Sequence, residues 1–488
     1  MSFQTAYWQA KANNRRYATY ITCRPVAGDN IEKYALTAYE RVLQASLKPA
    51  CLLESATHTG QIGRYSFICL EGEDTFVVQS QNDLVTLKEL LRANSPESME
   101  EVSPGWKLNL PFVGGAVGFL GHESISLIEP TVYRHTVDLH GIPDGCFVFF
   151  RNIIAFDYEE GCVSFIANVP VDLPLEEARK RGEHETERMF HTIFRSKRHK
   201  RKRETVDTKL IFSDTSKDEF LEMVHRAKRH IDAGDIFQVV LSQEFFTQYQ
   251  GSGVALYRAL RRINPSPYMF HMRFGDECKN MVLLGASPEI MSDIQNRTMR
   301  LRPLAGTCKR GANDAEDTAL GSALLNDPKE RAEHMMLVDL ARNDIGRFCT
   351  ANSIEVPELM RIVKCSHVMH IGSEVRGRLR QGVHPLDACL GSLPAGTLSG
   401  APKVRALQII AELEKQRRGV YGGAFGWFTD SGLDTCIVIR SAMLLNGQLC
   451  FRTGAGIVAD SVPENEFAET LRKARAMRLA LEQIGAQQ

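Results

Sequence analysis

Apolar residues gather in short runs separated by polar turns along the whole chain, and each run predicts a strand. In the first half the runs lie at 50–55, 64–72, 74–80 and 111–123, with a hairpin formed by 152–158 and 162–169. In the second half they lie at 235–246, 268–274, 281–287, 298–306, 421–430, 433–445 and 448–458. The last two meet at Asn446-Gly447, a dipeptide typical of hairpin turns.

Helical spacing of apolar residues predicts helices between these strands, at 31–44, 173–193, 216–235 and 254–264. Ser216 and Glu219 form a capping box at the start of the third helix, and Pro265 ends the fourth. Tight turns rather than crossover helices join the strands, which favours antiparallel pairing. The sequence therefore predicts an α+β fold, with a large, mostly antiparallel, β-sandwich-like core and helices packed outside.

The chain has 488 residues, of which 43% are hydrophobic and 24% charged, a globular composition that is too long for one ordinary core. Lys plus Arg and Asp plus Glu number 59 each, so no net charge attracts the chain to nucleic acid or to membranes. The N-terminal segment lacks the apolar core of a signal peptide. The twelve cysteines include no C-x-x-C pair. These features predict a cytoplasmic protein with no nucleic-acid or membrane partner.

A basic run, SKRHKRKR, lies at residues 196–203 and divides the chain. Such a run can be a localisation signal or a nucleic-acid patch. No aromatic residues punctuate it as a base-stacking surface requires, so a solvated linker is favoured. The predicted organisation is an N-terminal region at 1–195 that contributes to the sheet core, a basic linker at 196–210, and a catalytic domain at 211–488.

Two predicted helices each carry a pair of glutamates near the N-terminus. Glu330 and Glu333 follow Asp327, a predicted N-cap, and Glu466 and Glu469 repeat the spacing. Four carboxylates that converge in space need a cation, and an all-carboxylate set favours Mg²⁺. The alternative is a pair of solvated acidic helix faces, where this spacing is common. Beyond residue 334 the first helix is apolar on nearly all sides, so we expect it to be buried.

Two further segments suit an anionic ligand. Gly454-Ala455-Gly456 follows a strand without the pattern of a dinucleotide site, and its glycines permit close approach of a small anion. Residues 394–410 predict a helix with Ser399 as its N-cap. Arg440 lies inside an apolar strand run, where its charge requires either a carboxylate ligand or a structural ion pair.

Ten segments, in order along the chain, carry a more specific signal. They are LLESA (52–56), GDIFQVVLSQ (234–243), NPSPYMF (264–270), GASPE (285–289), RPLAGT (302–307), DPKERAEHMMLVDLARND (327–344), SHVMHIGSEVRG (366–377), LPAGTLSGAPK (393–403), RRGVYGGAFGW (417–427) and GAGIVADSVPENEFAETLRKA (454–474). Together they resemble the chorismate-utilising enzymes, and most closely the anthranilate synthase component I family.

The resemblance implies one reaction and its cofactor. Ammonia adds at C2 of chorismate with loss of the C4 hydroxyl, and pyruvate is then eliminated to leave anthranilate for tryptophan biosynthesis. Mg²⁺ is implied, bound directly by Glu333 and Glu469 and through water by Glu330 and Glu466.

The resemblance also implies the roles of individual residues. Glu289 matches the acid that protonates the departing hydroxyl, and His370 matches the histidine that assists pyruvate elimination. Thr307 and Gln238 complete the catalytic set. The implied substrate contacts are Gly306, Thr307, Tyr421, Arg440, Gly454, Ala455, Gly456 and Lys473. Outside the family context, His370 would be interpreted as a core histidine and Tyr421 as sheet packing.

Two positions distinguish members of the family. Isochorismate and salicylate synthases place a lysine before VVLS to activate water, and this chain has Gln238 there. Aminodeoxychorismate synthases carry a lysine in RPxKGT, and this chain has Ala305. Both differences favour anthranilate synthase. The alternatives are a synthase that stops at 2-amino-2-deoxyisochorismate, an aminodeoxychorismate synthase, and a non-catalytic regulatory homologue. The intact acids and His370 argue against the regulatory homologue.

A source of ammonia is implied outside the chain. No G-x-C-x-G nucleophile elbow with a downstream His-x-Glu is present, so no glutaminase domain is fused to it. The resemblance implies a glutamine amidotransferase subunit (component II), in a heterotetramer of two large and two small subunits. Free ammonia substitutes for it at high pH.

A second ligand site is also implied. In the resemblance, feedback-inhibiting tryptophan binds a pocket formed by Glu54 and Ser55 with Pro265, Tyr268 and Met269, and Cys436 lies nearby. Region 1–195 is then the regulatory part, and 211–488 is the chorismate-binding domain. The alternative is a strand end packed against a loop.

Overall fold

The computed structural model describes residues 2–26, 31–55, 63–96, 110–132, 137–195, 204–206, 210–364 and 368–485. Within these residues the chain forms two β-sheets packed face to face, and helices cover their outer faces. Every strand pair in these ranges is antiparallel. The α+β prediction and its sandwich-like core are therefore confirmed.

The first sheet has 13 strands and draws on both halves of the chain. Across the sheet they are β1 (Tyr17–Pro25), β8 (Cys162–Pro170), β7 (Asn152–Asp157), β3 (Tyr65–Leu70), β2 (Ala50–Glu54), β12 (Tyr268–Arg273), β13 (Val282–Ser287), β22 (Ser441–Leu445), β23 (Gln448–Ile457), β11 (Gln238–Gln250) and β10 (Phe212–Ser213), with β19 (Gly400–Ala401) and β9 (Thr205–Val206) also on β11.

The second sheet has 10 strands and carries most of the predicted catalytic residues. Across the sheet they are β16 (Leu304–Lys309), β18 (Val368–Arg378), β15 (Thr298–Leu301), β14 (Ile290–Gln295), β21 (Leu433–Ile437), β20 (Ala424–Phe428), β5 (Gly115–Leu120), β6 (Gly145–Phe150) and β4 (Asp74–Val78), with β17 (Glu355–Lys364) also on β18.

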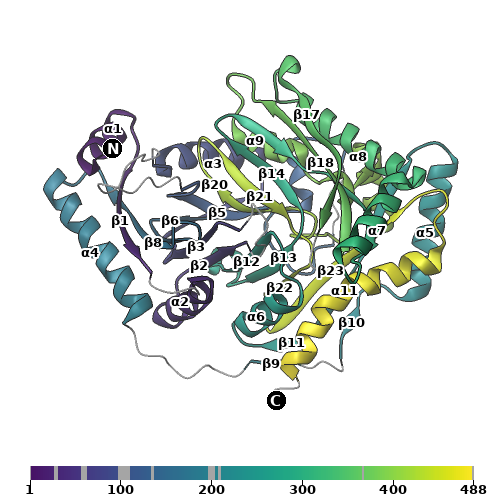
Figure 1. Cartoon of the computed structure of the whole chain (residues 1–488), viewed down its shortest axis with the longest axis horizontal. Helices are drawn as coiled ribbons and strands as arrows, with labels where there is room; N and C mark the ends of the chain where they lie inside the picture. Colours follow the sequence, from purple (N-terminus) through teal and green to yellow (C-terminus); the bar gives the residue numbers. More distant parts are fainter. Residues whose placement is uncertain are drawn as a thin grey trace.

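The helices lie outside the two sheets (Figure 1). The α-helices are α1 (Phe3–Ala12), α2 (Ile31–Ala45), α3 (Gln81–Asn94), α4 (Leu175–Phe194), α5 (Lys217–Asp232), α6 (Val254–Ile263), α7 (Asp314–Asn326), α8 (Pro328–Gly346), α9 (Pro385–Ser392), α10 (Lys403–Leu413) and α11 (Pro463–Gly485). Short 3₁₀ turns are η1 (His122–Leu127), η2 (Asp276–Cys278), η3 (Ala351–Ser353) and η4 (Gly396–Leu398).

The largest hydrophobic cluster lies between the sheets, where Phe270 of the first stacks on Phe425 of the second at 4.2 Å between ring centroids. Helices α1, α2 and α4 cover one part of the first sheet, and α5, α6, α10 and α11 cover the rest. Helices α3, α8 and α9 cover the second sheet. These ten helices thus bury apolar side chains against a sheet, which fixes the site residues on a rigid frame.

The predicted strand at 433–445 is wrong as one element. β21 belongs to the second sheet and β22 to the first, so the chain crosses between sheets at residues 438–440. Arg440 lies at this crossing with φ +50°, a left-handed conformation that turns the chain. The predicted strand at 298–306 is also divided, because Pro303 has no N–H for the ladder.

Two helix predictions also need correction. α8 is buried on one face only, since Met335 is 37% exposed and Asp339 is exposed, and the other face packs on β16 and β18. Ser399 does not cap the helix at 403–413. Its hydroxyl donates to the Ala395 carbonyl, and Pro402 occupies the N-cap position. By contrast, the capping box of Ser216 with Glu219 and the N-cap at Asp327 are confirmed.

The predicted boundary between regions falls mainly on residues 196–203 and 207–209, which lie outside the described residues, so it stays a prediction. Strands of 1–195 and of 211–488 share both sheets. Among the described residues, no helix is both long and apolar enough to cross a membrane.

Candidate active site

Three of the four predicted catalytic residues lie on or next to strands of the second sheet, and the fourth, Gln238, begins β11 of the first sheet. Glu289 directly precedes β14, His370 lies in β18, and Gly306 and Thr307 lie in β16. The ladder between β16 and β18 shifts register between Ala305 and Cys308, so Gly306 and Thr307 form a bulge beside His370. A bulge of this kind frees backbone groups and re-aims side chains, which suits a binding edge.

His370 is held in one tautomer by this bulge. Its Nδ1 lies 2.9 Å from the Gly306 carbonyl oxygen and 3.1 Å from the Thr307 hydroxyl. A carbonyl oxygen only accepts, so Nδ1 carries the proton and Nε2 has a free lone pair. Burial lowers the pKa of His370, with a smaller lowering effect from the Arg440 cation. The imidazole is therefore neutral near pH 7, with Nε2 able to accept a proton.

Glu289 is a buried carboxyl that can hold a proton. Burial raises its pKa to about 7, and the Thr397 hydroxyl, Arg440 and Lys473 lower it by less. The Thr397 hydroxyl, in η4, donates to Glu289 Oε1 at 3.0 Å. The backbone of Glu289 is fixed as well, because Ile437 N donates to its carbonyl at 3.0 Å. A carboxyl with this pKa can donate a proton at neutral pH.

Two positively charged side chains, Arg440 and Lys473, connect Glu289 and His370 to the rest of the predicted site. Arg440 lies close enough to affect the pKa of both Glu289 and His370. Lys473 affects Glu289, donates to the Gly454 carbonyl at 3.0 Å and lies 3.7 Å from Glu469. The sheet crossing at residues 438–440 therefore places Arg440 close to Glu289 and outside a strand interior.

β11 and β23 supply the wall on the other side. A Cβ on Gly454 would lie 3.0 Å from the Tyr421 hydroxyl, and one on Gly456 would lie 2.9 Å from Gln238 Nε2. These distances exclude any side chain at either glycine without movement of its neighbour. Gln238 Oε1 is buried and has no hydrogen-bond partner within the described residues. Burial raises the pKa of Tyr421 to about 12, so its hydroxyl stays protonated and can donate.

The two glutamate pairs lie at half-buried positions on α8 and α11. Glu330 Oε2 would lie 2.8 Å from a Cβ on Gly306, so the α8 pair adjoins the catalytic bulge. Burial raises the pKa of Glu330, and the neighbouring Glu333 charge adds to the effect. Glu469 pairs with Arg472 at 2.7 Å. A cation would relieve the repulsion in the α8 pair, so these carboxylates fit a hard divalent ion.

The structure does not gather the four glutamates into one cage. In the described ranges, the one group of three candidate ligands within 4.8 Å of one another is His140, Glu244 and Cys450. Glu244 accepts from His140 at 3.0 Å and from Gln416 at 3.3 Å, and Arg452 lies nearby. That trio belongs to a satisfied polar network. The Mg²⁺ ligand set stays a prediction.

A cavity of about 720 Å³ lies between the sheets, and we name it the intersheet cavity. It brings together Glu54, Ser55, Tyr268, Met269 and Cys436, as the sequence predicts, while Pro267 rather than Pro265 is in its wall. Its other charged lining residues are Arg64, Asp293, Arg300, Arg302, Glu358, Glu374, Arg376 and Asp434. Positively and negatively charged side chains therefore line the same cavity as the aromatic rings of Phe425 and Trp427.

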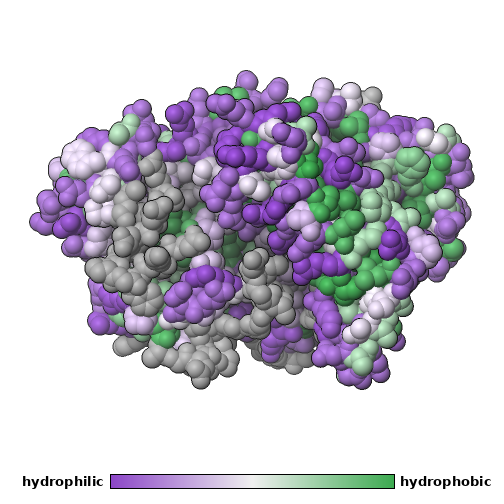
Figure 2. All heavy atoms as spheres, turned by 45° about the horizontal axis from the view of Figure 1, so that its top comes forward, coloured by the Kyte–Doolittle hydropathy of each residue, from purple (hydrophilic) through white to green (hydrophobic). Residues whose placement is uncertain are grey.

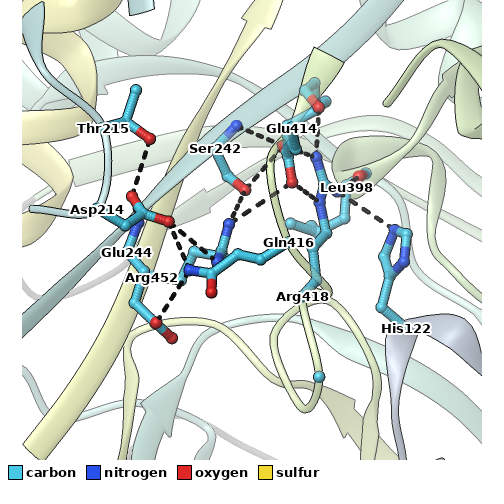
Figure 3. A network of polar contacts seen from close by, with 12 residues as sticks. His122, Asp214, Thr215, Ser242, Glu244, Leu398, Glu414, Gln416, Arg418 and Arg452 are labelled. Carbon is cyan, nitrogen blue, oxygen red and sulfur yellow. Dashed lines mark hydrogen bonds and ion pairs between the residues drawn. The ribbon is translucent and has the colours of Figure 1, made fainter. Parts of the chain in front are cut away.

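A buried ion network supports the wall formed by β11 and β23 (Figure 3). Arg418 pairs with Glu414 and donates to the carbonyls of Leu398 and Val240, both at 2.7 Å. Arg452 lies 3.6 Å from the same Glu414 carboxylate. Leu398 directly follows Thr397. The network therefore fixes the turn that carries Thr397, whose hydroxyl contacts Glu289.

Several residues of the site were not predicted from sequence. Thr397, Arg418 and Glu414 act through contacts between segments far apart in the chain, and each has an ordinary polar side chain. Asp434 accepts from Tyr268 at 2.8 Å, and its pKa is raised to about 7 by burial and by Asp293. The pairing of β14 with β21 in the second sheet brings Asp293 opposite Asp434, and no local pattern signals it.

The known proteins that are similar to this chain belong to one family of enzymes. The family model of chorismate binding enzymes matches residues 48–479. Anthranilate synthase component 1 of Geobacillus stearothermophilus is 41% identical over 97% of this chain and 96% of that protein. The same component of Bacillus caldotenax is 42% identical over 98% and 96%.

Solved structures agree with this fold. Anthranilate synthase component I from Streptococcus pneumoniae superposes with a TM-score of 0.73 at 33% identity, over 85% of this chain and 92% of that one. The menaquinone-specific isochorismate synthase from Escherichia coli has a TM-score of 0.70 at 18% identity, over 98% and 99%, which is a likeness of fold alone. The chain therefore belongs to the chorismate-binding enzymes and, within that family, to the anthranilate synthase component 1 group.

Proposed function

We propose that the chain converts chorismate and ammonia to anthranilate and pyruvate. The observation that carries this proposal is the pairing of a protonatable Glu289 with a neutral His370 across Arg440. One group can give a proton and the other can take one, which the two halves of the reaction require. Gln238 in place of a lysine leaves no base to activate water, so ammonia is the favoured nucleophile.

In the first half-reaction, the lone pair of ammonia forms a bond to ring C2, the two ring double bonds shift toward C4, and the C4–O bond breaks. The ammonium group formed on C2 then loses one proton. Glu289 gives its proton to the departing hydroxyl, which leaves as water. In this proposal Arg440 and Tyr421 hold the enolpyruvyl carboxylate, one by charge and the other by its hydroxyl. The N–H groups around Gly454–Gly456 and Lys473 hold the opposite end of the substrate.

In the second half-reaction, His370 Nε2 takes the proton from C2 as the C3–O bond breaks. The electron pair of the C2–H bond completes the aromatic ring, and the enol of pyruvate leaves and is protonated at carbon. The Gly306 carbonyl keeps Nδ1 protonated throughout, so Nε2 is the accepting atom.

Mg²⁺ is proposed as the cofactor, with Glu333 and Glu469 as direct ligands and Glu330 and Glu466 acting through water. When bound, it supplies positive charge to the ring carboxylate and to the charge that develops on the ring. The α8 pair supports the proposal, because repulsion between Glu330 and Glu333 raises the pKa of Glu330 in addition to burial.

The function is tested by incubating the purified chain with chorismate, MgCl₂ and ammonium. Anthranilate, detected by its fluorescence and mass, is the expected product. Accumulation of the unaromatised amino compound would assign the chain to the synthase that stops halfway. Formation of isochorismate would contradict the choice of nucleophile.

The rate should depend on pH in the direction set by Glu289. Its pKa of about 7 means that the protonated, active form is lost as pH rises through 7. With the concentration of free ammonia held constant, kcat/KM for chorismate should fall about tenfold per pH unit above this pKa. A flat profile up to pH 9 would contradict the role of Glu289 as the acid.

We propose a glutamine amidotransferase as the partner that supplies ammonia in a heterotetramer. Hydrophobic residues gather on the half of the molecule that carries α7, α8 and α11 (Figures 1 and 2). Phe237, which precedes Gln238, is 73% exposed, and its N–H donates to the Ala401 carbonyl. Phe237 is thus an exposed aromatic residue next to Gln238, the residue that favours ammonia as the nucleophile. Such a residue suits an interface with the subunit that delivers ammonia.

The Phe237→Ser variant should separate the two ammonia sources. Activity with glutamine and the partner subunit should fall about tenfold or more, as expected for an aromatic anchor, while activity with free ammonium stays within about twofold. Leu47→Ser, at another exposed apolar residue, serves as the control. Equal losses from both sources would show that Phe237 is not at the interface.

We propose the intersheet cavity as the binding site of tryptophan acting as a feedback inhibitor. Ser55 Oγ is buried without a hydrogen-bond partner among the described residues, which suits a ligand that supplies one. The mixed charges of the lining suit a zwitterion, and Phe425 and Trp427 offer aromatic surfaces to an indole.

The Ser55→Phe variant should fill part of this cavity and remove the hydroxyl. We expect the tryptophan concentration for half-inhibition to rise at least about tenfold, while turnover without tryptophan stays within about threefold. Inhibition curves for anthranilate formation measure both quantities. Unchanged sensitivity would exclude this cavity as the inhibitor site.

A further inference from the structure

The intersheet cavity and the active site are built on the same elements. Ile290 lines the cavity and directly follows the catalytic acid Glu289. In β18, Glu374 lines the cavity and His370 lies four positions before it along the same strand. Arg302 lines the cavity and stands just before β16, which carries Gly306. The wall of the cavity is thus continuous with residues that are assigned to both half-reactions.

A second, small cavity lies on the other side of this wall, and we name it the acid cavity. It is lined by Glu289 and Thr397, with Leu337, Leu340 and Ala341 of α8. Ile290 and Arg302 line both cavities. These two residues are therefore the partition between the proposed inhibitor site and the catalytic acid.

Arg302 forms an ion pair with Glu374 and lies near two further polar residues. Its Nε donates to Glu374 Oε2 at 2.9 Å, and a second guanidinium nitrogen lies 2.8 Å from the same oxygen. This ion pair ties the start of β16 to β18, the two strands whose bulge orients His370. Arg302 is also close enough to Asp434 and Tyr268 to interact with both electrostatically.

We propose that Arg302 is a positioning residue that couples occupancy of the intersheet cavity to the active site, through its ion pair with Glu374. This inference rests on the proposed function and deepens its regulation. A guanidinium can pair with Glu374 or with the carboxylate of an amino-acid ligand in the cavity, which gives two discrete arrangements. When the ligand draws Arg302 away, β16 loses this side-chain tie to β18 while the backbone ladder remains, and the partition beside Glu289 shifts.

The coupling is reciprocal by thermodynamic necessity, so chorismate must weaken tryptophan binding by the same factor as tryptophan weakens chorismate binding. The experiment measures both dissociation constants by calorimetry, without ammonium so that no turnover occurs, each in the absence and presence of the other ligand. In the wild-type chain each ligand should weaken the other by about tenfold or more.

Arg302→Gln and Glu374→Gln each break the ion pair from one side. In either variant the mutual weakening should fall to about threefold or less, while tryptophan still binds, and the double variant should add no further loss. Arg300→Gln is the matched control, because Arg300 pairs with Asp293 and lines the intersheet cavity but not the acid cavity. Its coupling factor should equal that of the wild type.

Each outcome bears on the proposal. Wild-type coupling retained in both Arg302→Gln and Glu374→Gln would overturn it, as would loss of coupling in Arg300→Gln to the same extent. A wild-type chain that forms anthranilate but shows no mutual weakening would also overturn it, while leaving the proposed activity intact. Failure to form anthranilate would instead overturn the proposed function, and the binding measurement would still decide the coupling.

Discussion

The Glu289→Gln variant should lose turnover by about 10²–10⁴-fold, the contribution typical of a positioned general acid. Glutamine keeps the shape of the side chain and the contact with the Thr397 hydroxyl, but it has no proton to give to the departing C4 hydroxyl. Because the loss is one of transition-state stabilisation, kcat should fall while KM for chorismate changes little. Steady-state kinetics with ammonium as the nitrogen source measures the effect.

A graded control is available at the same position. Glu289→Asp keeps the ionisable proton but shortens its reach, so it should retain more turnover than Glu289→Gln and keep a pH dependence. The decline above pH 7 should vanish from whatever activity Glu289→Gln retains. Turnover of Glu289→Gln within about threefold of wild type would show that another group, or water, protonates the hydroxyl.

The Glu469→Gln variant should raise the Mg²⁺ concentration for half-maximal rate by at least about 10–100-fold, because loss of even an outer-shell partner of a metal ligand weakens metal binding by that factor. Removal of one carboxylate also leaves Arg472 and Lys473 without their partner on α11. Turnover at saturating Mg²⁺ should remain below that of wild type, because the amide supplies no negative charge to the ion.

Glu464→Gln provides the comparison for this prediction. Glu464 lies in the first turn of the same helix, is exposed, and is not in the predicted ligand set. Its Mg²⁺ dependence should match the wild type. Undiminished turnover of Glu469→Gln in excess Mg²⁺, at the wild-type half-saturation, would overturn the metal assignment.

Arg440 illustrates how much of the site the sequence could predict. Its residue type and apolar surroundings indicated a charge in need of a partner. Its placement depends on the crossing between sheets at residues 438–440, where the apolar run continues without a turn signal. Local pattern therefore identified the residue but not its position, because the choice between two sheets is decided by long-range packing.

The lining of the intersheet cavity could also be predicted only in part. Glu54, Ser55, Pro265, Tyr268 and Met269 were predicted together from the family resemblance, and all but Pro265 line one cavity. Arg302 and Asp434 were not, because an arginine before a proline and an aspartate in a strand carry no local signal. Their role depends on β14, β18 and β21 lying side by side, a topology that hydrophobic spacing does not specify.

In the proposed reaction the chain transfers the nitrogen of ammonia to the chorismate ring and then releases pyruvate. One measurement tests it directly: incubation with chorismate, MgCl₂ and ¹⁵N-labelled ammonium at pH 8, with mass spectrometry of the aromatic product and enzymatic assay of pyruvate. We predict ¹⁵N-anthranilate and pyruvate in equal amounts. An oxygen-substituted product, or a nitrogen-substituted product without pyruvate, would contradict the account.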